Sequence, residues 1–590
     1  MKKQLFAVVA ALLISITTAA QDSTPKDRII VTATRTEIAV GDAIVPVTVI
    51  TRDQIEQSLA TDLAELLRFE AGMDVGRNGG PGQPTSIFLR GTESNHALVL
   101  IDGVRINPGT IGGAAIQNIA PEVIDRIEIV KGARSALFGT DAIGGVINII
   151  TRRSTGTYAE GSVGGGSFNS RSASASGGSR SDNGEFGVSL NWQKTDGFPV
   201  RSDSDLDRGY DNLSASVYLQ RRLGKNEVSL RHWQAAGTVE YLDFFLSPLD
   251  QDFQNASTAI EVLTQITDNA QSKLLLSHII DDVTQNQSDE FIESRRTSLD
   301  WQYSLAAENH TWVGGIYLVE ETAETLAFGS GFDEDTEVAA VFVEDQWSAG
   351  SHQAFVAVRL TDHETIGNKT TWNVEYAYDL SDRWTINAGI GHAFRAPDAT
   401  DRYGFGGNPD LAPEIADEIQ FGLRFWPDAR QRVSFELYRN DIEDLIEFDL
   451  ATFQLRNIGR AEIRGAQLAY EYQGDSFDLR ASLVHQKADN ATDGVRLLRR
   501  AERSATVALS KDIGKHTIGV SVLASGDRED FGQTKLDSYV LTNLTGRLAL
   551  SNRWQLNARI ENLLDETYET AAGFRMQERS GFLVLKYSWD

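Results

Sequence analysis

From about residue 154 to the end of the chain, apolar and polar residues alternate along successive segments. The apolar residues of Thr371–Leu380, Arg383–Arg395 and Arg553–Asn562 fall at every second position. Because successive side chains of a strand point to opposite faces, this period of two predicts strands with one apolar and one wet face. At roughly 20 residues for each strand and its connection, the stretch of about 440 residues provides about 22 strands. Closure into a barrel would leave no free edge.

The hydropathy of the chain excludes helical membrane spans and allows a membrane barrel. Mean hydropathy is −0.27, and no apolar run after the N-terminus approaches the ~18 residues that a spanning helix needs. Trp384 and Trp554 follow polar turns at predicted strand starts, as in the aromatic girdle of a membrane interface. A soluble β-propeller would repeat every ~40 residues, and no such repeat occurs. The sequence therefore predicts a transmembrane β-barrel, with short turns on one rim and long polar loops on the other.

The region before the barrel has a different pattern of apolar and polar residues. In Ile87–Arg153, short apolar runs alternate with glycine-containing turns, which predicts a small mixed domain of short strands. Upstream, Val45–Asp53 is predicted to be a strand and Asp53–Phe69 a helix. The leucines and isoleucine of that helix recur at helical spacing and are predicted to be core.

The first 20 residues have the pattern of an export signal. Lys2 and Lys3 precede the apolar stretch Leu5–Ile16, and small residues at 18–20 offer a cleavage site. The chain has no cysteine, so it has no disulfide scaffold and no thiol nucleophile. Its formal charge of −28 argues against a nucleic-acid partner. Neither HExxH nor GxSxG occurs, and we predict that the protein is not an enzyme.

Several strings in the sequence identify a family. IFLRG, LVLIDGVRIN and IDRIEIVKGARSALFGTDAIGGVINIIT resemble the plug domain of TonB-dependent outer-membrane receptors. Within that family, the corrinoid (cobalamin) transporters are the most similar, by NGGPGQPTSIFLRGT, DRIIVTATR, GFGGNPDLAPE, YRNDIEDLIEF and NIGRAEIRG. The resemblance implies a monomer in which an N-terminal mixed α/β plug fills the lumen of the barrel. It implies a signal peptide at 1–20, a periplasmic segment at 21–39, a plug at 40–153 and a barrel at 154–590.

The segment before the plug contains a very short β-prone core, Ile29–Val31, with polar flanks. Such a strand cannot fold alone, but it can add to the open edge of another protein's sheet. The residues themselves allow a second interpretation, the first strand of the plug. By resemblance, the segment is the TonB box, formed by Asp27, Arg28, Ile29, Ile30, Val31, Thr32, Ala33 and Thr34.

Two loops rich in glycine and proline, at 76–82 and 108–113, are predicted turns. Neither has the Lys-Ser/Thr of a nucleotide-binding loop. The resemblance implies that they are the outward apices of the plug and contact the corrinoid; the alternative is ordinary exposed loop. The implied ligand-binding residues are Pro84, Ser86, Glu93, Ile111 and Gly112 of the plug and Arg528 of the barrel. Glu93 and Pro84 depart from the family pattern, which has an amide and an aliphatic residue there.

One acidic cluster suggests a metal. Asp203, Asp205 and Asp207 stand at every second position, so an extended segment turns all three carboxylates to one side. Hard oxygen ligands suit Ca²⁺, and an EF-hand is excluded because its sixth position would be Arg208. The alternative is a solvated acidic loop. By resemblance, these three are outer-loop calcium ligands, and Asp243, Asp250 and Asp252 complete the structural Ca²⁺ site.

Charged residues of the plug are predicted to hold it in the barrel. By resemblance to family plugs, we expect Arg90, Arg126 and Arg134 to pair with acids that face the lumen. A buried ion pair is weak evidence for stability and better evidence for a specific, releasable contact.

The resemblance implies active import of a corrinoid across the outer membrane of a Gram-negative bacterium. TonB, with ExbB–ExbD, would supply energy from the inner-membrane proton motive force, and a periplasmic corrinoid-binding protein would receive the ligand. One alternative is import of an iron–siderophore or another metal chelate by the same mechanism. A second is a passive porin or surface receptor, which needs neither a plug nor a TonB box.

Overall fold

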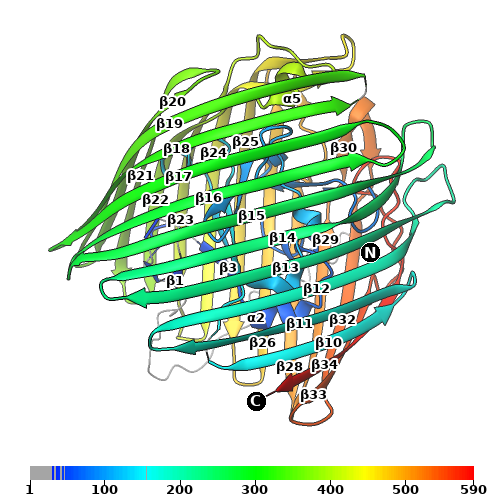
Figure 1. Cartoon of the computed structure of the whole chain (residues 1–590), viewed down its shortest axis with the longest axis horizontal. Coiled ribbons are helices and arrows are strands. Elements are labelled where there is room, and N and C mark those ends of the chain that lie inside the picture. The colour runs from blue at the N-terminus through cyan, green and yellow to red at the C-terminus, as the bar shows by residue number, and fades with distance from the viewer. Residues whose placement is uncertain are drawn as a thin grey trace.

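In the computed structural model, a closed antiparallel barrel of 22 strands surrounds the N-terminal domain (Figure 1). The structure describes residues 30–31, 35–36, 38–39, 43–45, 47–154, 156–327 and 329–589. Each barrel strand pairs with the next one in the chain, and the last strand returns to the first, from Ala159↔Trp589 to Gly166↔Phe582. The predicted strand number and closure are confirmed.

The barrel strands are long and follow the predicted alternation. β22 begins at Trp384 and β33 begins at Trp554, and both side chains are exposed, as predicted for a girdle. The two-residue β27 (Val495–Arg496) pairs only with β26 in the part of the chain that the structure describes. The strands are β10 (Tyr158–Gly166), β11 (Ser170–Ser181), β12 (Gly184–Pro199), β13 (Asp207–Leu223), β14 (Asn226–Leu242), β15 (Pro248–Thr267), β16 (Ala270–Gln285), β17 (Phe291–Ala307), β18 (His310–Ala327), β19 (Ser330–Ala349), β20 (His352–His363), β21 (Gly367–Ser381), β22 (Trp384–Arg395), β23 (Glu414–Phe425), β24 (Gln431–Asp449), β25 (Gln454–Gln473), β26 (Phe477–Asn490), β28 (Arg503–Ile513), β29 (His516–Ser525), β32 (Tyr539–Ala549), β33 (Trp554–Glu561) and β34 (Ser580–Trp589).

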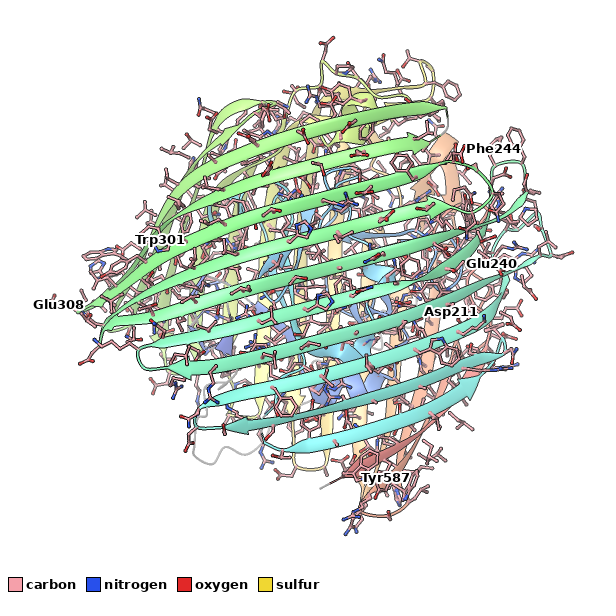
Figure 2. The ribbon with its side chains drawn as sticks, viewed as in Figure 1. Asp211, Glu240, Phe244, Trp301, Glu308 and Tyr587 are labelled. Carbon is pink, nitrogen blue, oxygen red and sulfur yellow. The ribbon has the colours of Figure 1, made fainter. Side chains whose placement is uncertain are left out.

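The two rims differ as the sequence predicts. Short turns, such as 308–309 between β17 and β18, join the strands at one end, and the longest loops lie at the other, which also has short connections such as 167–169 and 364–366. Figure 2 shows Glu308 and Phe244 at opposite ends of the barrel, in a short turn and in the β14–β15 loop. The long loops at 396–413 and 526–538 carry α5 (Ala399–Tyr403), η5 (Phe531–Gln533) and the hairpin of β30 (Arg528–Asp530) with β31 (Thr534–Leu536).

The plug is built on a five-stranded sheet of order β3-β8-β9-β6-β7, and β6 and β9 are its parallel pair. Its apolar core includes Leu67, Leu89, Ile127 and Ile147. The plug elements are β3 (Val47–Ile50), α2 (Arg52–Ser58), α3 (Leu63–Leu67), β4 (Met73–Arg77), β5 (Thr85–Leu89), η2 (Ser94–His96), β6 (Ala97–Ile101), β7 (Val104–Arg105), η3 (Ile116–Asn118), η4 (Pro121–Val123), β8 (Ile124–Lys131), α4 (Ser135–Phe138) and β9 (Gly145–Thr151).

The single helix predicted for 53–69 is wrong, because the chain forms two short helices there. Leu59 ends α2 in the left-handed conformation, with φ of 52°. Asp62 then caps α3, its Oδ1 accepting from the backbone nitrogen of Glu65 at 3.0 Å. Four of the five predicted core residues are buried, Ile55 on α2 and Leu63, Leu66 and Leu67 on α3, whereas Leu59 is half-buried.

Ahead of the plug, β1 (Ile30–Val31) pairs antiparallel with β2 (Ile38–Ala39). The signal peptide predicted at 1–20 lies outside the described residues, as do the box residues 27–29 and 32–34. Within the described part of the chain, no helix combines the length and the apolar character needed to span a membrane.

Candidate functional site

Buried charges join the plug to the barrel, beside apolar contacts such as the packing of Val104 with Ala259 and Ile279. Arg90 leaves β5 in a left-handed conformation and reaches the barrel wall, where its Nη2 lies 2.6 Å from Glu436 Oε2 and its Nη1 lies 3.3 Å from Glu418 Oε1. Its guanidinium also lies over the ring of Tyr438, 4.6 Å from the centroid. Arg134 pairs with Glu375 of β21. The predicted lumen-facing partners of Arg90 and Arg134 are therefore found.

Arg126 behaves differently, and its predicted pairing with the barrel is wrong. Its Nη2 lies 2.8 Å from Glu128 Oε1, and Asp125 lies 3.7 Å from its Nη1. Alternation along β8 places Arg126 and Glu128 on one face, so the arginine is neutralised within the plug.

Further polar contacts tie the plug to the wall around the barrel. Arg559 of β33 donates to Glu65 at 2.5 Å, and Arg480 of β26 donates to Glu70 at 2.9 Å. Lys131 donates to Gln467 at 3.2 Å, and burial lowers the pKa of this lysine to about 8. Hydrogen-bonded charges make an interface specific. They contribute less free energy to keeping the two surfaces together than packed apolar residues do. Such an interface suits a domain that has to move.

Arg35 fixes the chain immediately after the predicted TonB box. Its Nη1 lies 2.9 Å from Asp300 of β17, and its Nε donates to the carbonyl of Leu137 in α4 at 2.5 Å. The guanidinium lies over the ring of Phe342, 4.1 Å from the centroid. Gln302 donates to the backbone carbonyl of Arg35 at 3.2 Å. The end of the box segment is therefore bound to both the plug and the barrel.

On the long-loop side, a cavity lies between the plug and the barrel wall. The plug contributes the 108–112 loop and the 138–141 segment after α4. The wall contributes β17–β20, and the loop carrying α5 covers one side. This outer cavity is the candidate ligand site, because it lies at the rim predicted to face outward.

The outer cavity is rich in arginine. Arg105 pairs with Asp141, and Arg296 donates to Glu321 at 2.5 Å. Arg359 has no carboxylate partner within the described residues; its Nε donates to Thr361 Oγ1 at 3.2 Å. Arg395 contacts three carboxylates, those of Asp398 at 2.6 Å, Asp401 at 2.5 Å and Glu414 at 3.0 Å. Burial raises the pKa of Asp398, which also caps α5.

Only part of the predicted ligand set meets this cavity. Gly112 lines it, and the neighbouring Ile111 is 49 % exposed. Pro84 is exposed and Ser86 is half-buried near the start of β5, and Glu93 pairs with Arg500 of the barrel. Arg528 is buried, donating to the carbonyl of Glu569 at 3.0 Å with its guanidinium over the ring of Tyr539. The ligand roles of these six residues stay predictions.

The six predicted calcium ligands lie on long loops and strand ends but are not gathered. Asp203 forms two hydrogen bonds with Arg201, each 3.1 Å, and the Asp205 side chain is 98 % exposed. Asp207 begins β13, and Asp243 accepts from the backbone of its own loop. Asp250 binds Asn286 and Gln287, and Asp252 binds Thr238. Across the described ranges, no group of three or more acidic, histidine or cysteine side chains is arranged to hold a metal. The six carboxylates lie too far from one another in this structure to bind one calcium ion together. Calcium binding stays a prediction.

Sequence reasoning missed Arg35, Arg296, Arg359 and Arg395. The signal for Arg359 was available, because alternation places Arg359, Thr361 and His363 on the face opposite Leu360. Three polar residues on the inner face of one strand indicate a wet lumen wall.

Comparison with known families identifies the two domains. The TonB-dependent receptor-like β-barrel model matches residues 150–563, and the TonB-dependent receptor plug domain model matches residues 39–146. The chain belongs to the TonB-dependent receptor family. It is 29 % identical over 614 residues to the vitamin B12 transporter BtuB of Photobacterium profundum, covering 100 % of both chains. It is 29 % identical to the vitamin B12 transporter BtuB of Vibrio vulnificus, over 97 % of this chain and 96 % of that protein.

Solved structures share the fold of this TonB-dependent receptor. The ferric enterobactin receptor PfeA of Pseudomonas aeruginosa superposes with a TM-score of 0.80 at 16 % identity, over 92 % of this chain and 98 % of that one. The copper transporter OprC superposes with a TM-score of 0.77 at 18 % identity, over 90 % and 96 %. Identities this low show the fold alone.

Membership of the family establishes the general activity. The protein is a TonB-dependent transporter of the Gram-negative outer membrane, and the family implies an interaction with TonB and a small-molecule ligand. The family and the relatives are transporters and receptors rather than enzymes, as the sequence predicts. A passive porin is not supported.

Proposed function

We propose that this receptor imports a corrinoid of the cobalamin type. The observation that carries the proposal is similarity to vitamin B12 transporters over the whole length of the chain, plug and barrel together. The likeness to siderophore and copper receptors is confined to the fold. Import of a metal chelate by the same mechanism is the second candidate, and the fold shared with those metal receptors is what favours it.

The proposed route begins in the outer cavity. A ligand there would contact Phe138 and Gly139, at the end of α4. One residue earlier in α4, the carbonyl of Leu137 accepts from Arg35. A shift of α4 by a few tenths of an ångström would therefore change the geometry at the end of the TonB box segment.

The energy for transport would come from the other end of the molecule. TonB, driven by ExbB–ExbD, would pair with the released strand and pull. The buried ion pairs of Arg90 and Arg134 would then break in sequence, and the plug would rearrange inside the intact barrel. A periplasmic corrinoid-binding protein would take up the ligand.

A direct binding experiment tests the proposal. Purified receptor is titrated with cobalamin, with and without an excess of a ferric catecholate chelate. Tight cobalamin binding that the chelate does not displace supports corrinoid import. Tight binding of the chelate, with no binding of cobalamin, would overturn the proposal in favour of the second candidate.

A further inference from the structure

The outer cavity is lined by two buried guanidinium groups whose hydrogen-bond donors the protein does not fully satisfy. Arg359 is 1 % exposed and Arg296 is 3 % exposed, and both line the cavity. Within the described residues, the Nη1 atom of each has no hydrogen-bond partner. A guanidinium carries five N–H donors and is always charged, so leaving some of them unmet in a buried place is costly.

Arg359 is the stronger case. Its guanidinium lies against Gly139, where a Cβ atom would come within 3.3 Å of Nη2. The ring centroids of Tyr317 and Phe342 lie 5.1 Å and 5.9 Å from its Cζ. Contact with aromatic faces offsets only part of the cost of removing a cation from water. Asp300 is the acid that interacts electrostatically with Arg359. Both oxygens of its carboxylate already accept hydrogen bonds from Arg35 Nη1.

Other acids in the cavity do not neutralise its deep end, where Arg359 lies. Asp141 is paired with Arg105, and Asp398 is paired with Arg395. Glu334 stands eight positions before Phe342, the residue opposite Arg359, which is about 26 Å along β19 at ~3.3 Å per residue. Glu334 therefore lies toward the mouth of the cavity.

Arg296 lies nearer the mouth of the cavity, because it stands opposite Glu321, and Glu321 stands opposite Thr336, six positions before Phe342 on β19. One of its terminal nitrogens is bound by Glu321, and the other is free to donate to an anion in this part of the structure. His363 and Arg402 also line the cavity, and the imidazole of His363 is hydrogen-bonded to Thr365. A buried guanidinium with unmet, forked donors is an arrangement that recognises phosphate or carboxylate oxygens.

We propose that the deep end of the outer cavity is an anion-binding subsite, in which Arg359 holds a phosphate or carboxylate group of the transported ligand. This inference rests on the proposed function and narrows it. In a corrinoid of the cobalamin type, the group is the phosphodiester of the nucleotide arm. In a metal chelate, it would be a carboxylate.

The test compares ligands that differ in the anion. Cobalamin carries the phosphodiester, cobinamide is a corrinoid without it, and ferric citrate is an anionic chelate without a corrin ring. Each is titrated into wild type, Arg359→Gln, Arg359→Lys and the matched control Arg464→Gln, an exposed arginine of β25. Arg359→Gln should weaken cobalamin binding by about tenfold to a hundredfold, the range of a hydrogen bond to a charged group. Cobinamide binding should change by less than about twofold, and Arg359→Lys should fall between.

Thermal unfolding separates a binding effect from a folding defect. Arg359→Gln removes a buried cation with no carboxylate partner in the structure as described, so its Tm should equal or exceed that of wild type. A lower Tm, or an equal loss of cobalamin and cobinamide binding, would overturn the subsite.

The outcomes for function and subsite differ. Unchanged cobalamin affinity in Arg359→Gln overturns the subsite and leaves corrinoid import standing. Binding of ferric citrate alone, weakened by Arg359→Gln, supports the subsite and overturns corrinoid import. Failure of wild type to bind any of the three ligands overturns both.

Discussion

Arg35 Nη1 lies 2.9 Å from Asp300 Oδ2, although the two residues are 265 positions apart in the chain. The arginine side chain is 7 % exposed, and the carboxylate is bound through both oxygens. Arg35 directly follows the predicted TonB box, so this pair fixes the segment that TonB has to reach. The pair joins an energy-coupling segment to the barrel wall.

Removing the carboxylate should free that segment. We expect Asp300→Asn to increase the affinity of ligand-free receptor for a soluble TonB fragment by about tenfold to a hundredfold, because a charge-assisted hydrogen bond is lost. Titration of the fragment against detergent-solubilised receptor measures this. Arg126→Gln is the control, since that arginine pairs within the plug. Unaltered TonB affinity in Asp300→Asn would show that the pair does not restrain the segment.

The pairing of Ile30 with Ala39 leads to a second prediction. Ile30→Pro removes a backbone N–H and distorts the short strand, so a sheet of TonB could not accept it. Cobalamin binding should stay within about twofold of wild type, while energy-dependent uptake by whole cells should fall by at least about tenfold. Ile30→Val keeps the strand and serves as the control. Normal uptake in Ile30→Pro would contradict the role of the segment.

We expect the contact of Arg90 with Glu436 and Glu418 to stabilise the docking of the plug in the barrel. Arg90→Ala leaves two buried carboxylates without their cation, a change that costs about 3–5 kcal/mol in comparable buried pairs. We expect the plug of Arg90→Ala to be released at a lower urea concentration than that of wild type, while the barrel remains folded. Proteolysis of the plug at increasing urea concentrations measures the release midpoint. Arg439→Gln, on the exposed face of β24, should leave the release midpoint where it is in wild type. Equal midpoints for all three proteins would exclude a docking role.

Asp74 predicts a dependence of plug docking on pH. Burial raises the pKa of Asp74 to about 6, although Gln486 donates to its carboxylate at 2.8 Å. Because its unfolded pKa is about 3.9, the folded plug holds the extra proton between about pH 4 and 6. The stabilising contribution of the proton is complete below about pH 4 and is lost as the pH rises through 6.

The corresponding measurement compares Asp74→Asn with wild type in urea at pH 4.5 and 7.5. The amide introduced by this substitution cannot ionise, so the variant should gain up to about 3 kcal/mol of plug stability relative to wild type at pH 7.5 and much less at pH 4.5. The same difference at both pH values would rule out titration of Asp74 as the cause.

Much of the fold follows from local pattern. The alternation around Trp384 and Trp554 predicted strands that begin at those residues, and the strands do begin there. The resemblance to family plugs predicted Arg90, Arg126 and Arg134 as anchors, and Arg90 and Arg134 do pair with the barrel. The break at Leu59 was missed because helical spacing of leucines continues across it, and only the left-handed backbone reveals two helices.

The sequence by itself determined that this chain forms a membrane barrel preceded by a small mixed domain, because a period of two and a run of short strands are local properties of the chain. The resemblance to family plugs placed that domain in the lumen. Tertiary structure alone decided which charges meet. Arg126 pairs with an acid of its own strand, and Arg35 pairs with Asp300. Arg359 lines a cavity and has no carboxylate partner among the described residues. These pairings depend on the register and tilt of many consecutive strands around the plug, and a shift of one residue in any strand would turn its side chains to the opposite face.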